Sequence, residues 1–209
     1  MSARQDMASF LSQERKATNA IFICAGLWDK SDVEHSPAIL IRRRAWGDTS
    51  WIVTWLTLGQ GKVSTMARGA RRPASPFAGK LDLFFIGEIS FAPSRKSALH
   101  SLREVQILEP FDPSGLPSSN LFLCCYFAEL AELATEPGTP VSGIFDLLAR
   151  AIRHHRKNAA SLRALDFFEK ELALALGIGD AATHPLAALE AHCGRIPRSR
   201  AALLRLLKT

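Results

Sequence analysis

The chain has 209 residues, of which 47% are hydrophobic, and a formal net charge of +6. This composition is typical of a globular domain and excludes a disordered chain. The apolar runs are shorter than the roughly 20 residues of a membrane-spanning helix, and four cysteines are too few for a disulfide framework in a chain of this size. The opening residues hold no apolar segment of signal length, so we expect a cytoplasmic protein.

The basic residues are concentrated in one part of the chain. Residues 36–110 hold eleven Arg and Lys against five Asp and Glu. The residues before them hold four against five, and the residues after them eleven against ten. This distribution is expected when one region of a protein meets a polyanion, and a solvated basic surface is the alternative.

Residues 1–36 show no sustained period of helix or strand, and we expect a variable N-terminal leader there. Strand patterns begin directly after it. Residues 38–41 are apolar and residues 51–57 are β-branched and aromatic, so each stretch predicts a strand. Gly47 and Asp48 lie between them and predict the turn.

A third strand is predicted by the alternation of Val63, Thr65 and Ala67 with more polar residues. It ends in a cationic loop that is rich in arginine, proline and glycine. Residues 81–92 and 99–108 predict two further strands. Five short strands with basic loops between them are what a small closed barrel of the oligonucleotide-binding (OB) kind requires.

The hydrophobic period becomes helical beyond the fifth strand, and we place a domain boundary near Gly115. Three long helices and a short last one are predicted, the second with Thr139 as its cap and Pro140 as its first residue. The predicted fold class is therefore α+β. A five-stranded OB-fold β-barrel over residues 37–113 precedes an all-helical C-terminal domain over residues 114–209.

Two sets of short motifs are distinctive. The strand-rich half contains Pro37-Ala38-Ile39-Leu40, Trp46-Gly47-Asp48-Thr49-Ser50, Gly61-Lys62-Val63, Ala67-Arg68-Gly69-Ala70-Arg71 and Gly79-Lys80-Leu81. The helical half contains Tyr126-Phe127-Ala128-Glu129-Leu130 and Phe168-Glu169-Lys170-Glu171-Leu172. Together these motifs resemble the RecO family of bacterial recombinational repair proteins, over roughly residues 37–179.

The resemblance implies an OB barrel joined to a helical domain, without enzymatic turnover and without a cofactor. It implies binding of single- and double-stranded DNA, annealing of complementary strands coated by single-strand binding protein (SSB), and help with RecR in loading RecA. The implied partners are therefore DNA, RecR, the SSB C-terminal tail and, indirectly, RecA, at the nucleoid. Many members carry a four-cysteine zinc module where this chain keeps only Cys193, so we expect a reduced helical domain without that module.

Binding DNA through its backbone requires cations that extend from a rigid frame, and loops at strand ends provide one. The candidate nucleic-acid-binding residues are Arg42, Arg43, Arg44, Trp46, Lys62, Arg68, Arg71, Arg72, Lys80, Arg95 and Lys96. Trp46 lies beside a turn and is the candidate for stacking on a base. Trp51 and Trp55 share a strand face with Val53, and we expect them in the core.

The resemblance also places a dock for the acidic SSB tail on the helical domain. Such a tail needs an apolar groove beside cations. Tyr126 and Leu130 are the apolar candidates, and Arg150 and Arg153 are the charged ones. A core tyrosine beside a solvated basic stripe is the alternative interpretation.

No sequence pattern indicates catalysis or metal binding. The chain lacks a phosphate-binding loop, and His184, His192 and Cys193 have no fourth ligand at useful spacing. We therefore predict no catalytic residue, no metal and no cofactor. The alternative function is a protein-interaction adaptor whose OB barrel does not itself bind nucleic acid.

Overall fold

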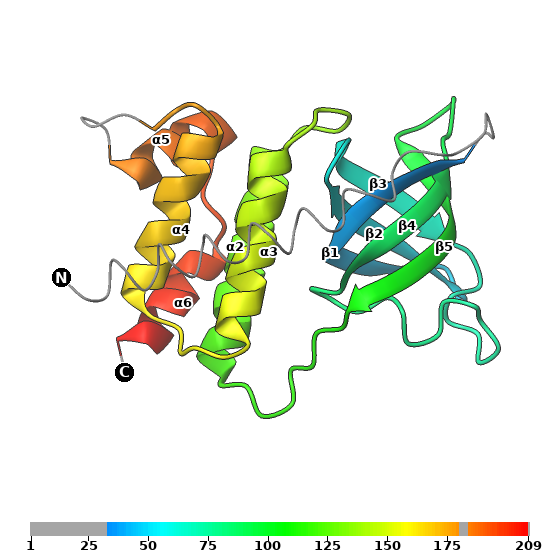
Figure 1. The fold of residues 1–209 in the computed structure, drawn as a ribbon, viewed down its shortest axis with the longest axis horizontal. Coiled ribbons are helices and arrows are strands. Elements are labelled where there is room, and N and C mark those ends of the chain that lie inside the picture. Colours follow the sequence, from blue (N-terminus) through cyan, green and yellow to red (C-terminus); the bar gives the residue numbers. More distant parts are fainter. Residues whose placement is uncertain (1–32, 180–183, 209) are drawn as a thin grey trace. The chain divides into compact units, whose positions relative to one another are not determined.

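The computed structural model describes residues 33–179 and 184–208. Its strands are β1 (Glu34–Trp46), β2 (Ser50–Thr57), β3 (Gly61–Ala67), β4 (Ile86–Ala92) and β5 (Leu99–Glu109) (Figure 1). Its helices are α2 (Ser118–Ala134), α3 (Ser142–His155), α4 (Leu162–Ala175), α5 (Pro185–Cys193) and α6 (Ser199–Leu207). None of these helices is long and apolar enough to cross a membrane.

The predicted leader lies outside the described residues except at its very end. There, β1 already begins at Glu34, three residues before the expected start of the barrel.

The five strands close into a barrel in the order β1-β2-β3-β5-β4, as the predicted OB fold requires. The first half of β1 pairs antiparallel with β4 and its second half antiparallel with β2. One strand reaches two neighbours because β1 is 13 residues long. A short parallel pairing of β3 with β5 completes the closure.

The barrel interior follows the alternation of the strands. Val63, Thr65 and Ala67 of β3 are buried, as predicted, while the residues between them are partly exposed. Trp55 of β2 is also buried, and its indole Nε1 donates to Thr65 Oγ1 at 2.8 Å. The predicted core position of Trp55 is therefore confirmed, and its polar atom is satisfied inside the barrel.

The fourth strand is shorter than predicted, because residues 81–85 lie outside it, with a turn at Leu83 and Phe84, and β4 begins only at Ile86. Phe84 has a positive φ of 67°, and its N–H donates to the carbonyl of Leu40 at 2.8 Å. The Phe84 ring is buried edge-on against Phe111, with ring centroids 5.1 Å apart. Burial of this ring outweighs the strand propensity of the stretch.

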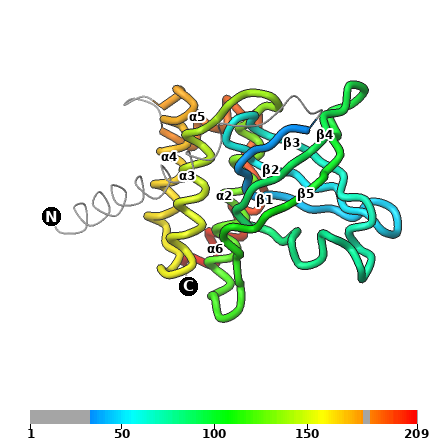
Figure 2. The backbone as a smooth tube through the Cα atoms, turned by 45° about the vertical axis from the view of Figure 1, so that its right-hand side comes forward, coloured from blue at the N-terminus to red at the C-terminus, as the bar shows by residue number. Residues whose placement is uncertain are grey.

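The helices pack on the outer face of the barrel. Ile39, Leu56 and Ile86 leave the strands on that face and belong to the same apolar core as the helices. Helices α2 and α3 lie next to the barrel, with α4 and α5 on their other side (Figure 2). The barrel and the helices therefore share one core across the predicted boundary near Gly115, and the domain limits themselves stay a prediction.

A glycine fixes one contact between the two parts. Gly61, at the start of β3, has a φ of +61°, and a Cβ there would collide with the carbonyl oxygens of Glu136 and Thr139. The N–H of Gly138 donates to the carbonyl of Gln60 at 3.0 Å beside it. The connection between α2 and α3 thus docks on the β2–β3 turn, and only glycine fits at position 61.

Two helix predictions need correction. Helix α3 begins at Ser142 rather than at Pro140, and its first turn has no side-chain cap, so Thr139 does not cap it. Thr139 and Pro140 belong instead to the connection that docks on the barrel. Helix α5 was not predicted, because its nine residues carry almost no amphipathic pattern and only Leu189 is buried.

Candidate nucleic-acid interface

Three side chains from three segments of the barrel form a stack. The guanidinium carbon of Arg43 lies 4.6 Å from the centre of the Trp51 ring, and that of Arg71 lies 5.4 Å from it. Each cation over an aromatic ring contributes about 0.5 to 1 kcal/mol at an exposed site. The stack therefore fixes the positions of two arginines that are distant in the sequence.

Hydrogen bonds hold the same two arginines. Arg43 donates to the Asp82 carboxylate at 2.7 Å and also to the carbonyl of Leu81. Arg71 donates to the carbonyl of Gly47 at 3.0 Å. Both guanidinium groups are thus oriented by the barrel while they remain accessible to solvent.

The cationic loop after β3 docks on the turn between β1 and β2. The N–H of Arg71 donates to the carbonyl of Thr49 at 2.8 Å, and the N–H of Gly69 donates to Ser50 Oγ at 3.3 Å. These bonds bring Arg68 and Arg72, which are exposed, to the same end of the barrel. In the part of the chain that the structure describes, no hydrogen bond or ion pair holds the side chains of Arg68 and Arg72.

Trp46, at the end of β1, is 50% exposed. The guanidinium carbon of Arg44 lies 5.6 Å from the centre of its ring. An exposed aromatic ring beside cations can stack on an unpaired base. We use the term basic rim for the residues at this end of the barrel: Arg43, Arg44, Trp46, Trp51, Arg68, Arg71 and Arg72.

Lys80 is half-buried at the far end of the cationic loop, where its N–H donates to the carbonyl of Phe77 at 3.0 Å. Phe77 and Leu81 of this loop are buried in the barrel interior. The loop that carries the arginines is therefore anchored at its other end by apolar side chains.

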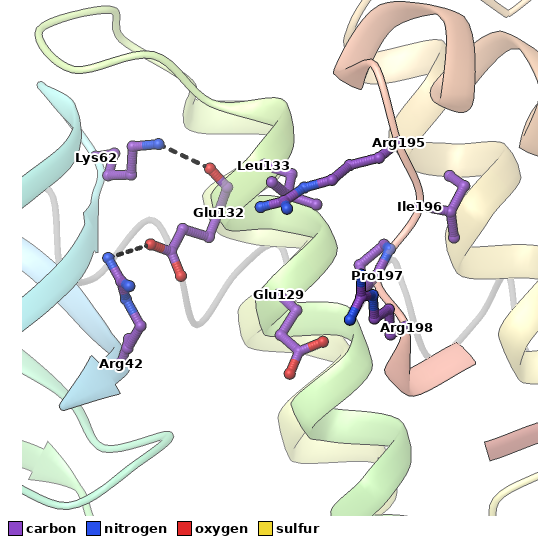
Figure 3. A pocket seen from close by; sticks show the side chains of 9 residues that line it. All are labelled: Arg42, Lys62, Glu129, Glu132, Leu133, Arg195, Ile196, Pro197 and Arg198. Atoms are coloured by element: carbon purple, nitrogen blue, oxygen red, sulfur yellow. Dashed lines mark hydrogen bonds and ion pairs between the residues drawn. The ribbon is translucent and has the colours of Figure 1, made fainter. Parts of the chain in front are cut away.

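Arg42 and Lys62 face the helices rather than the basic rim. Arg42 pairs with the Glu132 carboxylate at 2.8 Å, and Lys62 Nζ donates to the backbone carbonyl of the same residue at 2.9 Å (Figure 3). Successive residues of a strand point to opposite sides, so Arg42 and Arg43 of β1 have different surroundings.

Arg95 and Lys96 lie on the connection between β4 and β5. The end of β4 pairs with the start of β1, as the partners Phe91 and Glu34 show, whereas the β1–β2 turn follows the end of β1. Figures 1 and 2 show the two connections at separate places on the barrel. The structure does not bring Arg95 and Lys96 to the basic rim.

The four candidates for the SSB tail do not form a surface groove. Tyr126 and Leu130 are fully buried, and the Tyr126 hydroxyl donates to Glu169 at 2.6 Å. This correction follows from their position on the inner face of α2, where no peptide on the surface can contact them. The predicted core position of the tyrosine was the right alternative.

The two arginines of that set have different hydrogen-bond partners. Arg153 makes two hydrogen bonds to the Glu109 carboxylate, of 2.9 and 2.6 Å, and so joins α3 to the end of β5. Arg150 donates to the carbonyl of Asp146 in its own helix at 3.2 Å. Arg153 therefore has a structural partner, and Arg150 is the member of the set that a peptide can reach.

The two adjacent cysteines of α2 are poor nucleophiles. Burial raises the pKa of the Cys124 thiol to about 12 and also raises the pKa of Cys125, so neither is a thiolate at neutral pH. No group of three or more His, Cys, Asp and Glu side chains within residues 33–179 and 184–208 is placed to hold a metal ion. The predicted lack of metal in the whole chain stays a prediction.

Sequence reasoning placed Trp51 in the core, but its ring is only partly buried, and it missed Trp51 and Asp82 as partners of the rim arginines. The signal lay in strand register, because a turn at Gly47 and Asp48 pairs Ala45 with Trp51. Trp51 then becomes a diagonal cross-strand neighbour of Arg43, close enough for a long side chain to reach.

The fold and the site together define a class of protein: an OB-fold barrel that carries a basic rim and packs on a helical domain. Models of the recombination protein O family match both parts of the chain, the N-terminal model over residues 32–111 and the C-terminal model over residues 118–202. The chain belongs to the RecO family.

Several curated relatives carry the name DNA repair protein RecO. The protein from Salinibacter ruber is 29% identical over 152 residues, which cover 71% of this chain and 58% of the relative. The protein from Desulfosudis oleivorans is 32% identical over 114 residues, which cover 54% of this chain and 44% of the relative. The protein from Bacillus velezensis is 34% identical over 118 residues, which cover 55% of this chain and 44% of the relative. The chain spans about half the length of the curated relatives it matches.

Proposed function

We propose that this chain binds DNA through the basic rim and acts as a DNA-binding mediator in recombinational DNA repair. The observation that carries the proposal is the Arg43–Trp51–Arg71 stack, which holds two guanidinium groups in fixed positions beside Arg68 and Arg72. Membership of the RecO family and the names of the relatives support the repair role. Two parallel donors on each guanidinium suit phosphate oxygens.

The rim favours contacts to the DNA backbone over readout of sequence. Arginines supply the phosphate contacts, and stacking of a base on Trp46 adds roughly 1 to 3 kcal/mol. A surface of this kind accepts single strands of any sequence and also duplex phosphates. We therefore propose that the chain anneals complementary strands, because binding of each strand lowers the repulsion between them.

The proposal extends to partners that rest on the family alone. We propose that the chain works with RecR to help load RecA onto SSB-coated single strands, in the nucleoid, without a catalytic step. We retain a dock for the SSB tail on the helical domain, with Arg150 as its candidate cation. Tyr126 and Leu130 are left out of it because both are buried.

A titration of fluorescein-labelled single-stranded DNA tests the central part of this proposal. Binding through phosphates should weaken steeply between 50 and 200 mM salt, by roughly 0.7 in log–log slope for each contact. Absence of salt-steep binding would contradict the proposal and favour the adaptor function. The same protein should accelerate annealing of two complementary oligonucleotides coated with SSB.

A labelled acidic tail peptide tests the SSB part separately. Arg150→Glu should weaken peptide binding and leave naked-DNA binding unchanged, since Arg150 is outside the rim. Equal peptide binding by the variant and the wild type would remove Arg150 from the dock.

A further inference from the structure

A groove of about 700 Å³ lies between the barrel and the helices (Figure 3). Arg42 and Lys62 extend from the barrel on one side, and Arg195 and Arg198 come from the connection between α5 and α6 on the other. Leu133 of α2 supplies apolar surface between them. Four cations from two sides thus converge on one groove.

The positive charge of the groove is only partly neutralised. Two carboxylates line it, and one of them, Glu132, is taken by Arg42 at 2.8 Å. The other, Glu129, accepts a hydrogen bond from the Ser199 hydroxyl, which brings no charge. Four cations against two carboxylates leave a net charge of +2, which favours an anionic occupant.

The arginines from the α5–α6 connection have no partner of their own. Within the described residues, no hydrogen bond or ion pair holds the side chain of Arg195 or Arg198. In Figure 3 both side chains extend toward α2, Arg195 toward Leu133 and Arg198 toward Glu129. Their guanidinium donors are therefore available to a ligand in the groove.

A second, smaller groove lies beside this site and includes one arginine of the basic rim in its lining. It has a volume of about 280 Å³ and shares Arg42, Glu129 and Glu132 with the first. At its other end it reaches Arg43, whose guanidinium stacks on Trp51 in the rim. The two grooves therefore adjoin each other between the rim and the α5–α6 connection, and we use the term path for the two together.

We propose that a single strand of DNA leaving the basic rim follows this path, so that Arg195 and Arg198 bind its phosphates. The inference rests on the proposed function, because it extends the same strand from the barrel to the helical domain. Continuity with the rim favours a DNA strand over an acidic protein tail. Cations on both sides of the groove also match a backbone that carries charge along its length.

The groove also contains an element that opposes the ligand. Glu129 places a negative charge beside Arg198, so a phosphate there meets repulsion. Glu129→Gln keeps the shape and removes the charge, and it should tighten DNA binding roughly twofold at low salt, as expected for one solvent-exposed charge. Glu129→Gln should thus change DNA binding in the opposite direction to the removal of Arg195 and Arg198.

The experiment measures anisotropy of a labelled oligonucleotide of roughly 30 thymidines, longer than the roughly 4 to 16 nucleotides that one OB fold covers. Arg195→Ala with Arg198→Ala should make the log–log salt slope shallower by about 1.4, or 0.7 for each lost contact. Between 50 and 200 mM salt the wild type should then lose about sevenfold more affinity than the variant. Arg163→Ala with Lys170→Ala, which removes two exposed cations of α4, should match the wild type.

Three outcomes would overturn the inference. One is a wild-type salt slope for the Arg195 and Arg198 variant, together with a shallower slope for a rim variant in which Arg68, Arg71 and Arg72 are replaced by alanine. The proposed function would then stand, and the proposed path would be wrong. Another is an equal loss in the Arg163 and Lys170 control, which would indicate a general charge effect. The third concerns an acidic peptide with two apolar residues at its free carboxyl end. If the Arg195 and Arg198 variant no longer binds this peptide but binds DNA like the wild type, the groove belongs to a protein tail. Salt-independent binding by the wild type itself would instead contradict the proposed function.

Discussion

Two sets of arginines in the described part of the chain lie in different settings. Arg42, Arg153 and Arg200 each pair with a glutamate and join one helix to the barrel or to another helix. In the basic rim, Arg43, Arg44 and Arg71 contact aromatic rings or backbone carbonyls, with Asp82 on Arg43 as the one carboxylate among the described contacts of the rim. The charges of the first set are neutralised by glutamates within the fold, whereas the charges of the second set are available to a ligand.

The neighbours Arg42 and Arg43 illustrate what the difference teaches. Both belong to the same run of three arginines, yet one faces Glu132 of α2 and the other faces Trp51 at the rim. Counting charge along the sequence cannot separate them. Substitution can, because the paired set should control stability and the rim should control binding.

The largest effect is expected at the buried carboxylate of Glu169. It accepts a hydrogen bond from Tyr126 at 2.6 Å and binds Arg200 at 2.7 and 3.1 Å, which fixes α6 on α2 and α4. Glu169→Ala leaves both partners without an acceptor and should lower the free energy of unfolding by about 3 to 4 kcal/mol. Urea denaturation measures the change.

Glu169→Gln is the matched control, since an amide still accepts from the tyrosine. It should cost less than Glu169→Ala, and folded protein of either variant should bind DNA like the wild type. Weakened DNA binding by the folded variants would break the division between paired and rim arginines.

The second effect depends on pH and belongs to the helices alone. Burial lowers the pKa of His155 to about 4 from its usual 6.5, and its ring lies against Phe127 and His154. The unfolded state then binds more protons than the native state between these values. The contribution of the neutral His155 to the free energy of unfolding is therefore fully present above pH 6.5 and is lost as the pH falls toward 4. The loss should be about 3 kcal/mol.

Thermal unfolding at a series of pH values measures this loss. His155→Phe, which keeps a ring against Phe127 and removes the titration, should flatten the profile. Since His155 lies outside the basic rim, the salt slope of DNA binding at pH 6 and 8 should agree. An unchanged pH profile in the variant would show that another group titrates.

A third prediction concerns the contact between barrel and helices at Gly61. Gly61→Ala combines a positive φ with a collision against two backbone carbonyls, and should cost about 2 kcal/mol of unfolding free energy. Gly59→Ala is the control, because a Cβ there meets nothing within 4 Å. Similar melting temperatures for the two variants would contradict the docking of the α2–α3 connection on the barrel.

The smallest effect is expected for Arg153→Ala, which breaks the bidentate pair with Glu109. The two side chains are 18% and 30% exposed, so water offsets part of the loss, and we expect about 1 kcal/mol. A double-mutant cycle with Glu109→Ala isolates the pair. A coupling energy near zero would remove this pair from the contacts that stabilise the fold.

Much of the barrel could be predicted because its signals are local. Alternation in β3 and the glycine turn before it specify which residues are buried, and the structure agrees. The turn at Leu83 and Phe84 was missed because it depends on burial of Phe84 against Phe111, a contact with a residue far along the chain. Local patterns do not record contacts of this kind.

The same limit applies to the candidate site. The loop of Arg68, Arg71 and Arg72 could be singled out from its charge, but the partners of Arg42 and Lys62 come from α2, some 70 to 90 residues away. Tyr126 and Leu130 repeat at helical spacing, which is equally typical of a core face and of a groove. Only the packing of α2 against its neighbours decides between the two.

The most direct test of the central claim is the salt dependence of single-stranded DNA binding in two variants that lose the same charge. One replaces Arg68, Arg71 and Arg72 of the rim by alanine, and the other replaces by alanine three exposed cations of the helical domain, Lys157, Arg163 and Lys170. The account predicts that the log–log slope falls by about 2 in the rim variant, at 0.7 for each of three contacts, and stays at the wild-type value in the helical variant. Equal slopes in the two variants would contradict it.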